Sequence, residues 1–204
     1  MIVADIEYPR IFHSPGLEPW VLGILLRVKP KSMLDVGCGH GFWGFISKRR
    51  VSSLSWIVGL DLNYDRLIKA RAAYDDVVLA DAEKLPFRAG SFDALLAVEV
   101  LHGLRGNKLV AVLQWIKGIC KRVAIISFPG LNSDQRRVLT EHGFSLYRYL
   151  LRGFALIGNS GEVFSMYETG FIKFTGLLAR ILYPLLRLMK WFQEGYHLVT
   201  YFRE

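Results

Sequence analysis

Three glycines and an acid have the spacing of a ligand site in this sequence. Gly37, Gly39 and Gly41 alternate directly after the apolar residues 33–36. Asp61 ends a second apolar segment 20 residues after the last glycine. Glycine lets the backbone approach a ligand where a Cβ would collide, and a carboxylate one βα unit further on can accept hydrogen bonds from ribose hydroxyls. A strand, a glycine turn, a helix and an acid in this order predict a site for an adenosine-containing cofactor.

Two further segments follow in register and narrow the class of cofactor. The glycines read G-x-G-x-G, whereas a dinucleotide site reads G-x-G-x-x-G. Residues 77–87 then contain an apolar strand that ends in Asp81, and residues 91–104 contain another that is followed by Glu99 and His102. Together the four segments resemble the class I S-adenosylmethionine-dependent methyltransferases, and among these the methyltransferase type 11 group. The resemblance covers about residues 17–130.

The resemblance implies roles for the residues of the glycine turn. Gly37, Cys38 and Gly39 would form the turn beneath the methionine part of S-adenosylmethionine. Asp35 would support this turn from below, and Gly41 is the last glycine of the motif.

The resemblance also implies roles for residues at the ends of the next strands. Asp61 would hold the ribose 2′- and 3′-hydroxyls, and Leu62 would pack on the adenine face. Asp81 would accept a hydrogen bond from the adenine amine, and the backbone of Ala82 would donate one to the ring. The backbone of Ala97-Val98 would accept one from the methionine ammonium. The simpler alternative is that Asp61 or Asp81 is an ordinary capping acid.

Methyl transfer from a sulfonium is an in-line displacement, so the protein mainly positions an acceptor and excludes water. A general base is required only where the acceptor must lose a proton. His102 and Glu99 are the candidates because they follow the fourth strand; a structural role is the alternative for His102. Tyr8 and His13 are further candidates from the N-terminal segment. We expect a small, apolar or lipid-like acceptor that is methylated at an O or C atom.

Apolar strands that alternate with helical segments provide the frame for these residues. Strands are expected at about 32–36, 57–62, 76–80, 92–98 and 122–128. Helices are expected at about 17–28, 41–50, 63–74, 107–119 and 132–142. This alternation predicts a parallel sheet with helices on both faces, and every motif lies at the carboxyl ends of the strands, where such sheets bind ligands.

The resemblance makes the expected architecture more specific. It implies an α/β, Rossmann-like, doubly wound sheet of seven mostly parallel strands. Residues 144–151 would form the sixth strand, and residues 197–202 would insert antiparallel as the last one. The whole chain, 1–204, is expected to be one methyltransferase domain.

About residues 152–195 form an insertion where a short hairpin would suffice, and we expect it to be a helical, lid-like segment. Within it, residues 171–192 carry four cations and no carboxylate. As a helix, this stretch would place three of the cations within a narrow arc, with apolar residues around the rest. It could be a lid over the site, a contact with an anionic membrane surface, or a dimer interface. The cations and Pro184 argue against a membrane span.

The formal net charge of +8 allows a phosphate-rich partner. The basic clusters at 48–50, 121–122 and 136–137 are short, and each is more simply explained as a solvated face. RNA is nevertheless a second candidate acceptor, because tRNA wobble-uridine methyltransferases share the core motifs. A third alternative is a cofactor-binding partner protein without turnover.

Composition excludes several other classes of protein. A 52% hydrophobic content argues against disorder, and two cysteines cannot build a disulfide framework. The five histidines are scattered without ligand spacing, so no metal site is expected. Residues 1–10 lack the pattern of a signal peptide. We therefore expect a cytoplasmic protein, with peripheral membrane contact through 171–192 as a variation.

Overall fold

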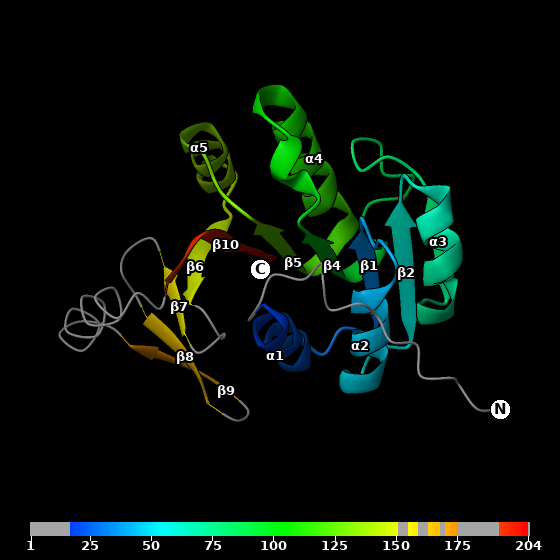
Figure 1. Cartoon of the computed structure of the whole chain (residues 1–204), viewed down its shortest axis with the longest axis horizontal. Coiled ribbons are helices and arrows are strands. Elements are labelled where there is room, and N and C mark those ends of the chain that lie inside the picture. The colour runs from blue at the N-terminus through cyan, green and yellow to red at the C-terminus, as the bar shows by residue number, and fades with distance from the viewer. Residues whose placement is uncertain (1–16, 151–154, 159–162, 168–169, 175–191, 204) are drawn as a thin grey trace.

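Five parallel strands form the part of the sheet that carries the glycine turn. The computed structural model describes residues 17–150, 155–158, 163–167, 170–174 and 192–203. The five strands are β1 (Ser32–Val36), β2 (Trp56–Asp61), β3 (Asp76–Leu79), β4 (Phe92–Val98) and β5 (Cys120–Phe128). They lie in the order β3-β2-β1-β4-β5, with β1 paired to β2 on one side and to β4 on the other. Figure 1 shows β2, β1, β4 and β5 side by side. The ends of β1, β2 and β4 therefore meet at one edge of the sheet.

The sheet continues beyond β5 with an antiparallel strand, as expected. Strand β10 (Phe192–Phe202) lies between β5 and β6 (Ser145–Leu150) and runs antiparallel to both. In the spatial order β3-β2-β1-β4-β5-β10-β6, six of the seven strands therefore run in one direction and β10 runs in the other. This confirms the predicted mostly parallel, Rossmann-like sheet.

Three further antiparallel strands extend the sheet past β6. They are β7 (Ala155–Gly158), β8 (Val163–Tyr167) and β9 (Gly170–Phe174). They fall in the insertion that was expected to be helical, so that prediction is wrong for these residues. The aromatic and β-branched residues of β8 and β9 favour strands. The predicted basic helix does not begin at Phe171, which lies in β9, and residues 175–191 lie outside the described residues.

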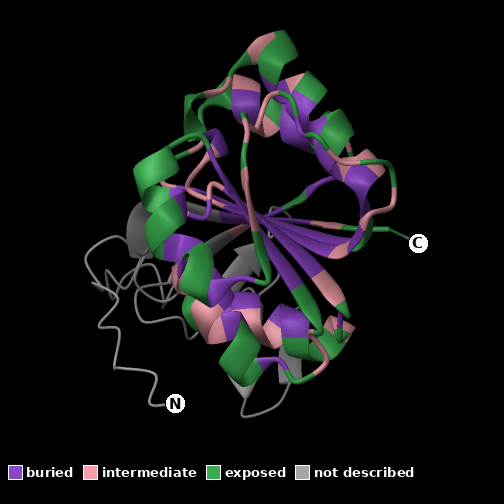
Figure 2. Cartoon of the chain, turned by 90° about the vertical axis from the view of Figure 1, so that its right-hand side faces the viewer, coloured by how far each residue is buried: buried purple, intermediate pink, exposed green. Residues whose placement is uncertain are grey.

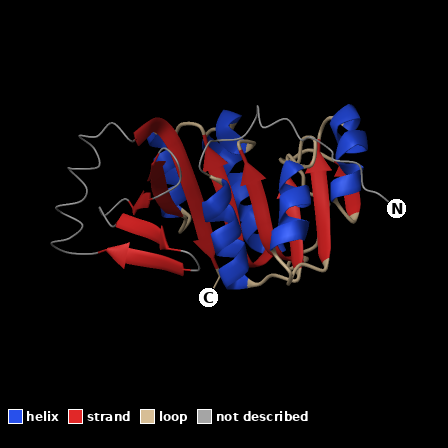
Figure 3. Ribbon diagram, turned by 60° about the horizontal axis from the view of Figure 1, so that its bottom comes forward, coloured by secondary structure: helices blue, strands red, loops and turns tan. Residues whose placement is uncertain are grey.

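Helices cover both faces of the sheet (Figures 2 and 3). They are α1 (Glu18–Val28), α2 (Phe42–Arg50), α3 (Tyr64–Ala70), α4 (Gly106–Ile119) and α5 (Ser133–Glu141). The apolar side chains of α1, α2 and α3 pack with Met33 in one core cluster, and those of α4 and α5 pack with Leu34 in the other. Neighbouring residues of a strand point to opposite faces of the sheet, which is why Met33 and Leu34 of β1 belong to different clusters.

Side-chain caps mark the start of two helices. The Asn63 side chain accepts the backbone N–H of Arg66 at the start of α3. Asn132 and Gln135 form a reciprocal capping box at the start of α5. No helix in the part of the chain that the structure describes is long and apolar enough to cross a membrane.

Candidate active site

The glycine turn directly after β1 has a backbone that favours glycine. The φ angles are +70° at Gly37, +55° at Gly39 and +96° at Gly41. At Gly37 a Cβ would also lie 2.1 Å from Cγ2 of Val100, which follows β4. At Gly39 a Cβ would have no heavy atom within 4 Å. The turn is therefore closely packed at Gly37 and open at Gly39.

Asp61 ties the glycine turn to the end of β2. One carboxylate oxygen accepts the backbone N–H of Gly39 at 2.9 Å, and the other accepts that of Asn63 at 2.9 Å. The side chain is 7% exposed. Asp61 thus acts as a local cap, which was the simpler alternative for this acid, and it does so beside the turn that it was expected to serve.

Beneath the turn, Asp35 is buried and accepts a hydrogen bond from the Tyr74 hydroxyl at 2.5 Å. The same hydroxyl accepts the backbone N–H of Gly44 at 3.1 Å. Burial raises the pKa of Asp35 to about 7; the negative charge of Asp61 adds to this effect and the Tyr74 hydrogen bond opposes it. The support predicted from Asp35 is therefore a polar contact between β1, the start of α2 and Tyr74.

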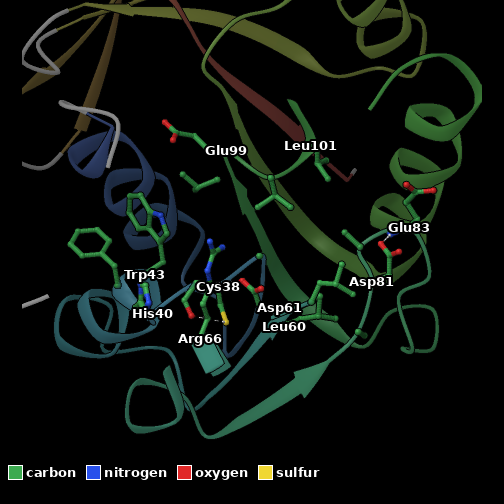
Figure 4. A pocket seen from close by; sticks show the side chains of 18 of the residues that line it. Cys38, His40, Trp43, Leu60, Asp61, Arg66, Asp81, Glu83, Glu99 and Leu101 are labelled. Carbon is green, nitrogen blue, oxygen red and sulfur yellow. Dashed lines mark hydrogen bonds between the residues drawn. The ribbon is translucent and has the colours of Figure 1, made fainter. Parts of the chain in front are cut away.

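A cavity of about 530 Å³ opens above these residues at the carboxyl ends of the strands (Figure 4). Eight of the eleven predicted cofactor residues line it: Gly37, Cys38, Gly39, Asp61, Leu62, Asp81, Ala82 and Val98. The other three, Asp35, Gly41 and Ala97, do not line it. Asp35 and Ala97 are buried, at 1% and 0% exposure. The structure therefore brings together residues from four separate segments of the sequence.

Acidic side chains lie at both ends of the cavity. Asp81 and Glu83 lie at one end and Glu99 lies at the other, with Asp61 between them (Figure 4). The Asp81 carboxylate accepts the backbone N–H of Glu83 at 2.8 Å. Leu62, although apolar, is 70% exposed beside Asp61. An exposed apolar side chain next to a carboxylate suits a ligand with a flat ring and hydroxyl groups.

Of the two predicted acid–base residues, Glu99 lines the cavity and His102 does not. Glu99 has a φ of +57°, a conformation that is unusual for a residue with a side chain. Burial raises the pKa of its carboxyl, and nearby His102 partly offsets this. The Nδ1 atom of His102 lies 2.8 Å from the Glu99 backbone oxygen. Tyr8 and His13 lie outside the described residues.

The sequence analysis missed several residues that line the cavity. Phe42 and Trp43 follow the last glycine in the first turn of α2, and Arg66 comes from α3. His40 also contributes from the glycine turn. The signal for the first two was their position, because side chains directly after a ligand-binding turn face the ligand.

The composition of the chain raised two further questions: the state of its cysteines and the presence of a metal site. Cys38 and Cys120 are both buried free cysteines, and burial raises the pKa of each thiol, so both stay protonated at neutral pH. Among the residues that the structure describes, no three His, Cys, Asp or Glu side chains gather as a metal site would require.

Comparison with known proteins places this site in a family. A family model for a methyltransferase domain of the type 11 group matches residues 34–128. Over 91% of its length the chain also superposes on 94% of a SAM-dependent methyltransferase from Archaeoglobus fulgidus, with a TM-score of 0.57 and 16% identity. This structural likeness supports the fold.

Three curated relatives match shorter segments. A malonyl-[acyl-carrier protein] O-methyltransferase of Legionella pneumophila is 35% identical over 38% of this chain and 28% of its own length. A fatty-acid O-methyltransferase of Mycolicibacterium smegmatis is 38% identical over 46% of this chain and 32% of its own. A tRNA (carboxymethyluridine(34)-5-O)-methyltransferase of Xenopus tropicalis is 33% identical over 50% of this chain and 16% of its own.

The matches thus span about a third or less of each curated relative. The family model spans the glycine turn, Asp61 and Asp81, and together with the fold of a SAM-dependent methyltransferase it indicates S-adenosylmethionine as the cofactor. Residues 34–128 match the methyltransferase domain of the type 11 group, and the chain has the fold of the S-adenosylmethionine-dependent methyltransferases.

Proposed function

We propose that this chain transfers a methyl group from S-adenosylmethionine to a small, apolar or lipid-like acceptor at an O or C atom. The observation that carries the proposal is the composition of the cavity. Four carboxylates and the glycine turn supply polar groups to the lining, and Phe42, Trp43, Leu101 and Leu104 contribute apolar lining. A site with polar groups for a cofactor and apolar walls for a second molecule suits transfer to an apolar acceptor.

The residues present fit this cofactor. Each oxygen of the Asp61 carboxylate accepts one backbone N–H, and a carboxylate oxygen has capacity for a second hydrogen bond. Asp61 can therefore bind the ribose hydroxyls without releasing the glycine turn. The exposed Leu62 offers an apolar surface to the adenine ring, and Asp81 offers an acceptor to its amine.

At the other end, the backbone around Val98 and the turn at Gly37–Gly39 would hold the methionine part. S-adenosylmethionine supplies the electrophilic methyl group, and the chain's own residues position the acceptor and keep water out. Glu99 is the candidate general base, because it lines the cavity. His102 is proposed as a positioning residue for the segment that carries Glu99, since its ring contacts the Glu99 backbone.

The curated relatives support an apolar acceptor. Two of the three are named for acyl substrates, malonyl-[acyl-carrier protein] and fatty acid. The third is named for a tRNA nucleoside, which together with the net charge of +8 keeps RNA as the second candidate acceptor.

Calorimetric titration with S-adenosylmethionine and S-adenosylhomocysteine tests the cofactor assignment. We expect Asp61→Ala to weaken binding of S-adenosylmethionine at least tenfold, since two hydroxyls lose a charged acceptor. Asp65→Ala is the matched control, because Asp65 is exposed on α3 and does not line the cavity. Unchanged affinity in Asp61→Ala would contradict the assignment.

Radiolabelled methyl transfer to lipid extracts and to RNA separates the acceptors. Label in the lipid fraction supports the proposal, whereas label in RNA with a salt-sensitive gel shift supports the alternative. Binding of S-adenosylmethionine without transfer to either fraction would favour a non-catalytic partner protein. Membrane contact through 171–192 is a separate proposal, and co-sedimentation with anionic liposomes that is lost in Arg180→Glu and Arg187→Glu would support it.

A further inference from the structure

The cavity is lined by more acids than the charge of the chain suggests. The chain has a net charge of +8, yet four carboxylates line the cavity. Arg66 and His40 are the basic side chains among the lining residues. Glu83 forms an ion pair with Lys108 at 3.1 Å. A surface of this sign attracts a cationic methyl donor and repels an anionic acceptor.

Glu99 is the acid at one end of the cavity. It lies at the far end of the cavity from Asp81 and Glu83 (Figure 4). The next residue, Val100, packs directly on Gly37 of the glycine turn. Glu99 is therefore fixed beside the part of the turn that would hold the methionine moiety, and the apolar side chains of Leu101 and Leu104 line the same cavity.

Hydrogen bonds hold the segment that carries Glu99 in its unusual conformation. The Glu99 backbone N–H donates to the Ser127 carbonyl of β5 at 3.2 Å, and His102 contacts the Glu99 carbonyl. The buried Gln135 of α5 donates to the carbonyls of His102 and Leu104, each at 3.0 Å. A non-glycine residue kept at positive φ by surrounding contacts is a frequent feature of functional sites.

From this arrangement we propose that the acceptor is a neutral hydroxyl group on an apolar molecule, and that Glu99 takes its proton. The inference rests on the proposed methyltransferase function and goes further by naming the class of acceptor. The hydroxyl oxygen forms the new bond to the methyl carbon as the carbon–sulfur bond breaks with its electron pair left on sulfur. The hydroxyl proton moves to the Glu99 carboxylate, which later releases it to water.

The same carboxylate discriminates against ionised acids. An acceptor carboxylate needs no base, and its negative charge would be repelled by Glu99 in a partly buried site. A hydroxyl acceptor does need a base, and burial raises the pKa of Glu99, which makes it a stronger proton acceptor. The chain would then differ from relatives that are named for fatty acids and malonyl groups.

The chemical stability of the transferred methyl group identifies the acceptor class without knowledge of the acceptor. The purified chain is incubated with S-adenosylmethionine that carries a tritiated methyl group and with a total lipid extract. Mild alkali releases methyl esters as methanol, whereas hydriodic acid releases methyl ethers and leaves C-methyl groups in place. We expect label that is stable to alkali and released by hydriodic acid. Label released by alkali, or stable to both reagents, would overturn the inference.

Variants of Glu99 and of an exposed acid provide the second readout. We expect Glu99→Gln to lower the rate of ether formation at least a hundredfold while the affinity for S-adenosylmethionine changes less than fivefold. Asp65→Asn is the matched control, because Asp65 is exposed on α3 and does not line the cavity, and it should leave both the rate and the affinity unchanged. An undiminished rate in Glu99→Gln would remove Glu99 from the reaction. No binding of S-adenosylmethionine, or no label in lipid from the unaltered chain, would instead refute the proposed function itself.

Discussion

The Tyr74 hydroxyl and the Asp35 carboxylate meet 2.5 Å apart beneath the glycine turn, and both side chains are buried. Tyr74 also fills the space beside two glycines, since a Cβ at Gly44 would lie 2.4 Å from its ring and one at Gly59 2.9 Å. A single side chain thus connects β1, β2 and α2 under the site. The floor of the cofactor cavity depends on this tyrosine, which no motif identifies.

Tyr74→Phe removes the hydroxyl and leaves the ring. We expect the free energy of unfolding to fall by about 1–3 kcal/mol, because a buried carboxyl loses its donor. Urea denaturation measures this change, and Tyr64→Phe on the exposed face of α3 is the control, with an expected change within about 0.5 kcal/mol. Equal stability of the two variants would show that the hydroxyl contributes nothing.

Asp35 makes the stability of the protein depend on pH. Because its pKa is raised from 3.8 to about 7 in the folded state, the folded chain holds a proton that the unfolded chain has lost between these values. The contribution of this group to stability is therefore greatest below pH 4, falls as the pH rises to 7 and is level above.

Asp35→Asn tests this dependence, because asparagine cannot ionise and its carbonyl can still accept from Tyr74. Urea denaturation measures the free energy of unfolding of the variant and of the unaltered protein at each pH. The value for the variant minus the value for the unaltered protein should be larger at pH 8 than at pH 5. Asp65→Asn at an exposed position provides the reference. A stability difference for Asp35→Asn that does not vary with pH would contradict the raised pKa.

Gly37→Ala and Gly39→Ala separate steric collision from backbone strain. Both positions have positive φ, so each variant carries a strain of about 1–2 kcal/mol. At Gly37 the new methyl group would also collide with Val100, so this variant should be the less stable of the two in thermal denaturation. Adding Val100→Ala should restore part of the loss at Gly37 and none at Gly39. If Val100→Ala restored as much stability to Gly39→Ala as to Gly37→Ala, a collision with Val100 would not explain the loss at Gly37.

Glu99→Gly and Glu99→Gln differ in backbone strain and share the loss of the carboxylate. Glycine adopts the φ of +57° without the penalty that a Cβ brings, so Glu99→Gly should be more stable by about 1 kcal/mol. Calorimetric unfolding compares them directly. If Glu99→Gln were the more stable variant, the conformation at this position would not be strained.

The sequence was sufficient to predict the elements whose pattern is local. The strands from residues 32–36 to 122–128 are short apolar runs, and the structure has them within two residues of the expected bounds. The glycine turn and Asp61 follow from a motif with a fixed order, and the structure brings them into contact.

Features that depend on tertiary contacts could not be predicted in this way. Tyr74 lies in no motif, and its role appears only when β1 and α2 are packed around it. Arg66 faces the cavity because of the direction of α3. In the insertion, cation spacing was given more weight than the aromatic and β-branched residues of 163–167 and 170–174, which pair as strands.

The position of β10 has a consequence for synthesis on the ribosome. Strands β1 to β5 are complete once residue 128 has been made, and they can pair in order as they emerge. Strand β6 cannot join them, because residues 192–202 fill the place between β5 and β6. Until these residues leave the ribosome, the edge of β5 is unpaired and exposed to other nascent chains. Slow translation of residues 129–202 would prolong that interval and favour aggregation over folding.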